Sequence, residues 1–311
     1  SRTLLFDIGE LDWSDELCDL LGVKPDSLPE PLPSAHVFGE TEEFGGSLPV
    51  AGIAGDQQAA LYGQACSEPG NAKNTYGTGS FFLQNAGTEA PPLKEGVLNT
   101  VAWGVSDRVD YAVEASIFVT GAAVQWLRDG LGIIARASET EELAGSIESN
   151  DGVYFVPALT GLGSPYWDPY ARGTMVGLTR GSGRAHVARA ALESIAYQAA
   201  DAVRAIEAAT GERMEELKAD GGATVNGWLM QFQADVLGIP VIVPEVAETT
   251  ALGAAYLAGV ATGQWSEADT RSMWREAARY EPRMSGDERE ALLADWARAV
   301  ERSRAWVRHD E

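Results

Sequence analysis

The chain has 311 residues, of which 45% are hydrophobic, so it can bury the core of one large domain or of two ordinary ones. The 23 lysines and arginines face 46 aspartates and glutamates, and a net charge of −23 argues against any function in nucleic-acid binding. No uninterrupted apolar run is long enough to span a membrane, and Cys18 and Cys66 show neither a metal-binding spacing nor a disulfide framework. A cytoplasmic protein without a Cys/His metal site is therefore expected.

The excess of acid is spread along the chain, and lysine is scarce. This composition favours a surface adapted to high salt, where screening removes the repulsion between like charges. An acidic bacterial enzyme from an ordinary habitat is the alternative.

In chain order, the first 50 residues are rich in turn residues, and a mobile loop is expected at 40–47. A short apolar strand then ends at Gly55, a helix is expected over 57–66, and a new sheet begins over 72–86. Beyond it, strands are predicted at 97–103, 110–114, 153–157, 174–178, 216–220 and 240–243, and helices at 116–131, 186–209, 226–237, 250–262 and 287–306. This alternation indicates an α/β layer architecture.

Two glycine-containing turns are candidates for contact with a nucleotide. Residues 74–84 read as a hairpin whose Gly-Thr-Gly turn at 77–79 can present N–H groups and a hydroxyl to phosphate. Residues 217–230 read as a strand, an Asp-Gly-Gly turn and a helix whose free N–H groups suit an anion. Taken singly, the first is more often a structural hairpin and the second an ordinary connection, with Asp220 shaping its turn.

A third motif, Ala-Gly-Ile-Ala-Gly-Asp-Gln-Gln at 51–58, places Asp56 where a helix should start. An aspartate there is usually an N-cap, worth about 1 kcal/mol. The same position also allows a carboxylate to face a cleft as a general base.

Together these motifs resemble the FGGY carbohydrate kinases, and the resemblance extends along essentially the whole chain. The stretches Gly-Thr-Met-Val-Gly-Leu at 173–178 and His-Val-Ala-Arg-Ala-Ala-Leu-Glu at 186–193 fit the family's C-terminal signature. The loop at 161–173 is similar to that of members that phosphorylate glycerol rather than a pentulose. The resemblance implies an actin-like ATPase (ribonuclease H-like) domain and transfer of phosphate from ATP, with Mg²⁺, to glycerol.

On the substrate side, the resemblance implies that Asp56 is the base that accepts the glycerol hydroxyl proton, and that it binds Mg²⁺ directly or through water. Gln57 is implied to hydrogen-bond a glycerol hydroxyl, and Phe81 to form an apolar wall for the glycerol carbons. From the residues alone, Gln57 would be an exposed helix residue and Phe81 a core aromatic.

On the nucleotide side, the resemblance implies that Thr78 faces the β- and γ-phosphates. Gly121 and Gln125, four residues apart and so on one helix face, are implied to touch ATP. Gly222 and Asn226 match the family's adenosine-binding positions, and Asn226 is also a good helix N-cap.

The family has two actin-like domains with the active site between them. The resemblance implies that residues 1–66 are the end of the first domain and residues 67–311 the nucleotide-binding second domain. Phosphorylation of glycerol is accordingly expected of a longer parent protein, as a homodimer or homotetramer, and the chain alone is expected to be inactive. A kinase for a pentulose or gluconate, and a module that binds nucleotide without transferring phosphate, are the alternatives.

Overall fold

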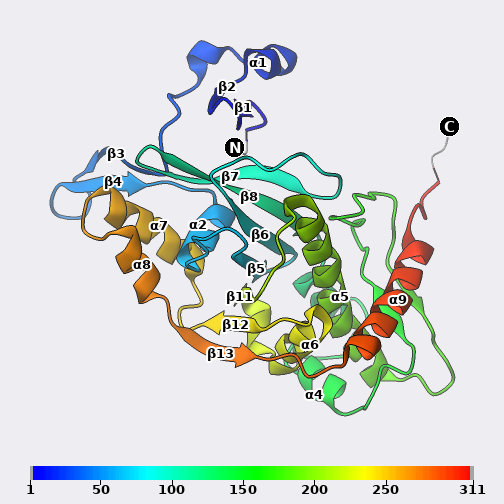
Figure 1. Ribbon diagram of the computed structural model, residues 1–311. Helices are drawn as coiled ribbons and strands as arrows, with labels where there is room; N and C mark the ends of the chain where they lie inside the picture. The colour runs from blue at the N-terminus through cyan, green and yellow to red at the C-terminus, as the bar shows by residue number, and fades with distance from the viewer. Residues whose placement is uncertain (1–2, 309–311) are drawn as a thin grey trace.

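A nine-stranded mixed sheet runs through the computed structural model, which describes residues 3–308 (Figure 1). Its strands, in spatial order, are β13 (Glu276–Tyr280), β12 (Val241–Pro244), β11 (Leu217–Gly221), β5 (Ala72–Tyr76), β6 (Ser80–Gly87), β8 (Arg108–Ile117), β7 (Leu98–Val105), β3 (Ala35–Thr41) and β4 (Leu48–Gly52). Strands β12, β11 and β5 are parallel, whereas β6 pairs antiparallel with both β5 and β8. Residues 1–2 and 309–311, at the ends of the two predicted domain ranges, lie outside the described part of the chain.

The other elements surround this sheet. The larger helices are α2 (Asp56–Gly63), α3 (Gly121–Asp129), α5 (Arg184–Thr210), α6 (Gly227–Leu237), α7 (Thr249–Ala261) and α9 (Gly286–Ser303). The smaller elements are β1 (Phe6–Asp7), β2 (Asp12–Trp13), α1 (Asp15–Leu21), the 3-10 turn η1 (Pro25–Ser27), α4 (Glu139–Gly145), β9 (Tyr154–Val156), β10 (Thr174–Val176), the 3-10 turn η2 (Gly222–Val225) and α8 (Glu267–Met273). The first of these, β1, β2 and α1, form a lobe that projects from the rest of the molecule (Figure 1).

Strand alternation places one hydrophobic core on each face of the sheet, and a third cluster lies around α3 and the start of α5. Phe82 of β6 packs in one core with Leu192 of α5, and its neighbour Leu83 packs in the other with Leu61 of α2 and Leu257 of α7. Because both faces are covered by helices, consecutive residues of the central strands are buried, and the sequence lacks a simple alternation of apolar and polar residues there.

Helices α2 and α7 cross with their backbones almost in contact. A Cβ atom added to Gly253 would lie 1.8 Å from the carbonyl oxygen of Ala59, and one added to Gly63 would lie 2.1 Å from that of Thr249. Gly253 and Gly63 therefore permit this crossing, whereas Ala254 and Ala258 of α7 lie against Gly52 of β4.

The predicted α/β class is confirmed, and most elements after residue 72 lie within a few residues of their predicted bounds. The helix predicted over 116–131 is wrong at its start, because Ile117 still pairs with Ser80 in the ladder between β6 and β8. The loop predicted at 40–47 is also too long, because residues up to Thr41 and from Leu48 belong to β3 and β4. Among residues 3–308, no helix combines the length and apolar character needed to span a membrane.

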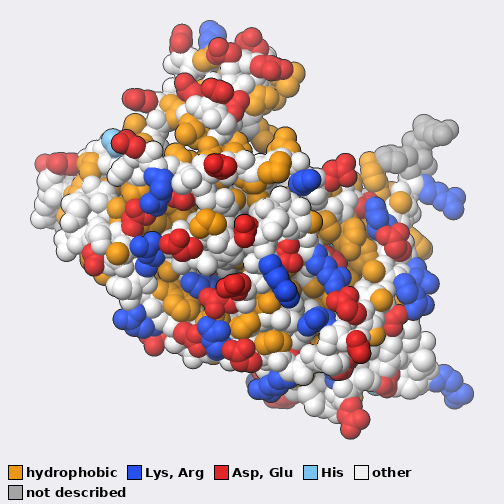
Figure 2. Space-filling model, in the orientation of Figure 1, with side chains coloured by type: hydrophobic (Ala, Val, Ile, Leu, Met, Phe, Trp, Pro, Cys, Tyr) orange, Lys and Arg blue, Asp and Glu red, His pale blue; other side chains and the backbone are white. Residues whose placement is uncertain are grey.

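The charge distribution leads to a prediction about salt. Acidic and basic side chains are interspersed over much of the face in Figure 2, but the lobe formed by β1, β2 and α1 is mainly acidic there. With a net charge of −23, repulsion between like charges opposes the compact state, and salt screens it over a Debye length of about 10 Å at 0.1 M and about 3 Å at 1 M. We expect the thermal unfolding midpoint to rise as KCl is raised from dilute buffer to about 1 M. A midpoint that stays constant or falls across the KCl series would contradict adaptation to high salt.

Candidate active site

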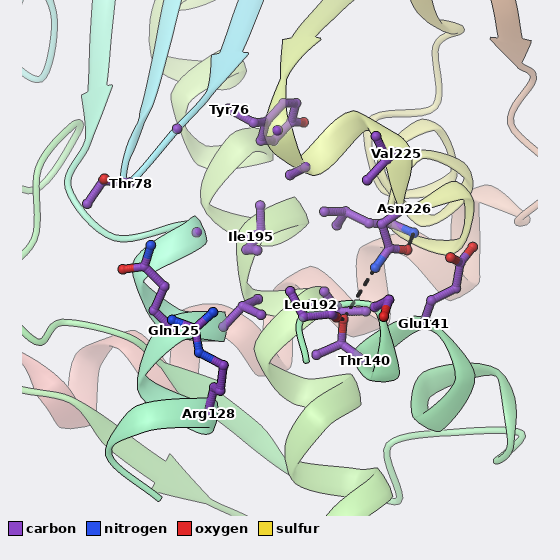
Figure 3. Close-up of a pocket in the computed structure, with 18 residues that line it drawn as sticks. Tyr76, Thr78, Gln125, Arg128, Thr140, Glu141, Leu192, Ile195, Val225 and Asn226 are labelled. Atoms are coloured by element: carbon purple, nitrogen blue, oxygen red, sulfur yellow. Dashed lines mark hydrogen bonds between the residues drawn. The ribbon is translucent and has the colours of Figure 1, made fainter. Parts of the chain in front are cut away.

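A cavity of about 410 Å³ opens beside the turn between β5 and β6 (Figure 3). Segments far apart in the sequence form its wall: the end of β5 and its turn, helices α3, α4 and α5, the 3-10 turn η2 and the start of α6. It is lined by Tyr76, Gly77, Thr78, Gly121, Val124, Gln125, Arg128, Ala137, Ser138, Thr140, Glu141, Leu192, Ile195, Gly222, Ala223, Val225, Asn226 and Leu229. The lining is mostly apolar with polar groups at intervals, which is typical of a small-molecule site.

The turn of the β5–β6 hairpin forms one end of the cavity. Tyr76 and Ser80 close the ladder, so the turn has the three residues that the sequence predicted. Helix α3 starts directly against it: the N–H of Thr120 donates to the carbonyl oxygen of Thr78 at 2.9 Å, and that of Gly121 to Gly77 at 3.1 Å. A Cβ atom on Gly121 would lie 2.5 Å from the same Gly77 oxygen, so only glycine permits this close approach.

The Asp-Gly-Gly motif forms the facing wall. Gly221 has φ +90°, and a Cβ atom there would lie 2.2 Å from the carbonyl oxygen of Tyr76, whereas a Cβ on Gly222 would meet nothing within 4 Å. Gly221 thus allows β11 to leave the sheet beside β5, and Gly222 lies open on the cavity. The carboxylate of Asp220 is buried and accepts hydrogen bonds from Gln64 Nε2 at 2.7 Å and Thr249 Oγ1 at 2.6 Å. Asp220 therefore joins α2 to α7, a structural role that the sequence did not predict in this form.

The start of α6 differs from the prediction in one respect. Asn226 is the N-cap, as predicted, and its Oδ1 accepts the N–H of Leu229 at 2.9 Å. The N–H of Trp228 donates to Glu141 Oε1 at 3.2 Å. These two N–H groups already have partners, so the expectation that this helix offers its free N–H groups to an anion is wrong for them. Within the described chain, the β5–β6 turn is the better candidate to contact phosphate.

Five residues predicted to contact nucleotide come from three separate segments of sequence, and all five line this one cavity: Thr78, Gly121, Gln125, Gly222 and Asn226. Sequence reasoning missed several others. Arg128 is three residues after Gln125 and shares its helix face, so that spacing could have found it. Thr140 and Glu141 lie in α4, a helix that was not predicted, and Asn226 Nδ2 donates to Thr140 Oγ1 at 3.4 Å (Figure 3). No local pattern signals that contact across 86 positions.

The residues predicted to contact the polyol lie outside this cavity, and two of them are held together by a short chain of hydrogen bonds. Asp56 is exposed at the start of α2. Its Oδ1 accepts the backbone N–H of Gln57 at 2.9 Å, and its Oδ2 accepts Gln57 Nε2 at 3.1 Å. The Gln57 side chain is itself buried, and its Oε1 accepts a hydrogen bond from the ammonium of Lys73.

Phe81 belongs to the same face of the sheet as Lys73. Phe81 pairs with Thr75 across the hairpin, and residues two apart on a strand, such as Lys73 and Thr75, share a face. Tyr76 has the opposite parity and lines the cavity. The two predicted sets of ligand residues therefore lie on opposite faces of one hairpin, and its turn at 77–79 lies between them.

The residues present suit a magnesium ion that arrives with a nucleotide rather than one held by the protein alone. No group of three or more His, Cys, Asp or Glu side chains that could hold a metal is found among residues 3–308. Asp56 offers one exposed carboxylate, and protein-bound Mg²⁺ is commonly held by one or two carboxylates together with substrate phosphates and water. Asp56 therefore fits the predicted ion as a single protein ligand.

Two protein-family models match this chain. Residues 72–262 match the model of the FGGY family of carbohydrate kinases, C-terminal domain, and residues 1–63 match that of the N-terminal domain of the same family. The chain belongs to the FGGY family of carbohydrate kinases. The resemblance inferred from the sequence motifs is confirmed.

Two curated relatives illustrate the similarity of this FGGY chain to glycerol kinases. The glycerol kinase of Symbiobacterium thermophilum is 57% identical over 310 residues, which are 99% of this chain and 62% of the relative. Glycerol kinase 2 of Thermotoga maritima is 56% identical over 309 residues, again covering 62% of the relative. The FGGY chain thus spans about three-fifths of the length of the relatives it matches.

Solved structures support the fold of this family member. The Plasmodium falciparum glycerol kinase with ADP superposes with a TM-score of 0.91 at 35% identity, covering 97% of this chain and 62% of that one. A xylulose kinase from Lactobacillus acidophilus superposes with a TM-score of 0.80 at 20% identity, which shows the fold alone. The actin-like ATPase fold predicted from the sequence is confirmed.

Proposed function

We propose that the protein containing this chain transfers the γ-phosphoryl group of ATP to glycerol, forming sn-glycerol 3-phosphate and ADP. The observation that carries the proposal is that residues predicted for the two substrates lie on opposite faces of the β5–β6 hairpin. That arrangement suits a reaction in which a nucleotide phosphate and a polyol meet at the turn between them. The names of relatives at 56% and 57% identity support glycerol as the polyol.

Asp56 acts as the general base. Its exposed carboxylate can accept the proton of the attacking hydroxyl as the oxygen–phosphorus bond forms and the bond from phosphorus to the β–γ bridging oxygen breaks. Asp56 would be the protein's ligand to a Mg²⁺ ion bound with ATP, and that ion would neutralise charge on the phosphates. Gln57 binds a glycerol hydroxyl and Phe81 packs against the glycerol carbons.

The cavity receives the nucleotide. Thr78 and the turn at 77–79 contact the β- and γ-phosphates, Gly121 and Gln125 flank the nucleotide from α3, and Gly222 and Asn226 contact the adenosine. The absence of a side chain at Gly222 leaves room there, since a Cβ atom would meet nothing within 4 Å.

A substrate panel on the full-length protein tests this function. ADP release is measured with MgATP and, in turn, glycerol, a pentulose and gluconate. We expect turnover with glycerol to exceed that with the other two by at least about 100-fold, because a pentulose and gluconate carry additional carbons that a site for a three-carbon polyol must exclude. Preference for the pentulose or gluconate would reject glycerol as the substrate.

The 311-residue chain by itself gives a separate expectation. It has the cavity and should bind ATP, but weakly, with a dissociation constant of about 1 mM, or about −4 kcal/mol. It should form no glycerol 3-phosphate, because transfer requires two domains to close around both substrates and the chain spans only 62% of its relatives. Calorimetric titration and coupled ADP release measure the two quantities. Turnover above background that is lost on Asp56→Asn would show that the chain is catalytically sufficient.

A further inference from the structure

Lys73 of β5 carries a charge into the interior of the protein. Its side chain is 0% exposed, and its Nζ donates to Thr75 Oγ1 at 2.8 Å and to Gln57 Oε1. Burial lowers the pKa of Lys73 to about 8, against the opposing attraction of Asp220 on β11, Glu114 on β8, Cys66 after α2 and Asp56. Removing an ammonium from water is costly, so its presence between α2 and the sheet calls for a specific role.

The chemistry of the ammonium fixes the orientation of the neighbouring amide. An ammonium has three donors and no acceptor, so the carbonyl oxygen of Gln57, and not its NH₂ group, must face Lys73. The NH₂ group is then directed to the other side, where it donates to Asp56 Oδ2 at 3.1 Å. A reversed amide would place its NH₂ against the ammonium and its oxygen against the carboxylate, which is repulsive at both ends.

We propose that Lys73 is a positioning residue that orients Gln57, and through it the carboxylate of Asp56, for phosphoryl transfer to the polyol. The inference rests on the proposed function. An NH₂ group has two N–H donors, and Lys73 fixes the direction of both. One donates to the Asp56 carboxylate, and the other is directed to an oxygen of the substrate. Lys73 touches neither substrate, and its effect reaches them only through Gln57.

Lys218 provides a matched comparison. It lies on the adjacent strand β11, in register with Lys73. Its Nζ donates to the carbonyl oxygens of Gln64 at 2.8 Å and Ala65 at 3.3 Å, and it lies 4.4 Å from the ring centroid of Trp274. Lys218 therefore holds the chain just after α2 but has no link to Gln57. Comparing the same substitution at the two lysines therefore separates an effect on the orientation of the Gln57 amide from a general effect on the support of α2.

The test uses the full-length protein and steady-state kinetics with glycerol and MgATP. We expect Lys73→Met to lower kcat roughly 10- to 100-fold, the loss typical when a group that orients a functional residue is removed. The KM for ATP should change less than about threefold, and Lys218→Met should keep kcat within about threefold of wild type. In a Gln57→Ala background, Lys73→Met should cause no further loss, because Lys73 acts through Gln57. Additive losses in the double variant, or equal losses for the two lysines, would overturn the proposal.

A second readout does not depend on turnover. With glutamine labelled with ¹⁵N, the side-chain NH₂ signal of Gln57, identified by its absence in Gln57→Ala, should shift in Lys73→Met and stay in place in Lys218→Met. An unchanged Gln57 signal in Lys73→Met would overturn the proposal even if that variant unfolds at lower temperature. Failure of the wild-type protein to phosphorylate glycerol would reject the proposed function, while this spectrum would still decide whether Lys73 orients Gln57.

Discussion

Replacing Asp56 with asparagine in the full-length protein is expected to lower kcat roughly 10²- to 10⁴-fold, the range for loss of a general base. Asparagine keeps the shape of the side chain and can still accept the N–H of Gln57, but it cannot take a proton from the attacking hydroxyl. The affinity for ATP should change far less, because residue 56 does not line the cavity proposed to receive the nucleotide. Initial rates at saturating glycerol and MgATP, with a separate ATP titration, measure both.

The matched control for this variant is Asp151→Asn. Asp151 has a side chain that is 69% exposed and pairs with His186, and neither residue lines the cavity. Its kcat should stay within about twofold of wild type. If Asp56→Asn instead retains near-normal turnover, Asp56 is not the base.

The second large effect concerns stability rather than chemistry. Gly253→Ala should lower the free energy of unfolding by about 3 kcal/mol, because its Cβ would lie 1.8 Å from a backbone oxygen of α2 and the two helices would have to separate. Urea denaturation followed by circular dichroism measures the change.

Gly145→Ala serves as the control for the helix effect of the substitution. Gly145 is also helical, but its Cβ would meet only the Trp228 ring at 4.0 Å, so alanine should leave stability unchanged or raise it by about 0.5–1 kcal/mol. If the two variants are equally stable, the close crossing of α2 and α7 does not constrain residue 253.

The sequence predicted long periodic elements well and tertiary detail less well. The helix predicted over 186–209 corresponds to Arg184–Thr210, because this long run is rich in alanine and contains neither glycine nor proline. Strand β3 was missed, and the strand predicted to end at Gly55 corresponds to β4, which ends at Gly52. Much of β3 and β4 is exposed, and their burial pattern lacks the expected alternation. The start of α3 was misplaced because only a contact with a distant turn decides where β8 gives way to helix.

The candidate site shows the same division. The family resemblance, rather than any local pattern, pointed to Thr78, Gly121, Gln125, Gly222 and Asn226, and all five line one cavity. Lys73 was not identified, because in sequence a buried lysine looks the same as a solvated one. Its burial arises only when α2 packs over β5, which no local pattern records.

The placement of the two ligand groups on opposite faces of the β5–β6 hairpin has a consequence for how this scaffold can diversify. On a pleated strand, successive side chains point to opposite faces of the sheet. Thr75 and Phe81 therefore belong to one face of the hairpin, and Tyr76 belongs to the other. A substitution on the face proposed to contact the polyol can therefore spare the face proposed to contact the nucleotide, one residue away. A fold so divided can change what it contacts on one face of the hairpin while the other face stays the same.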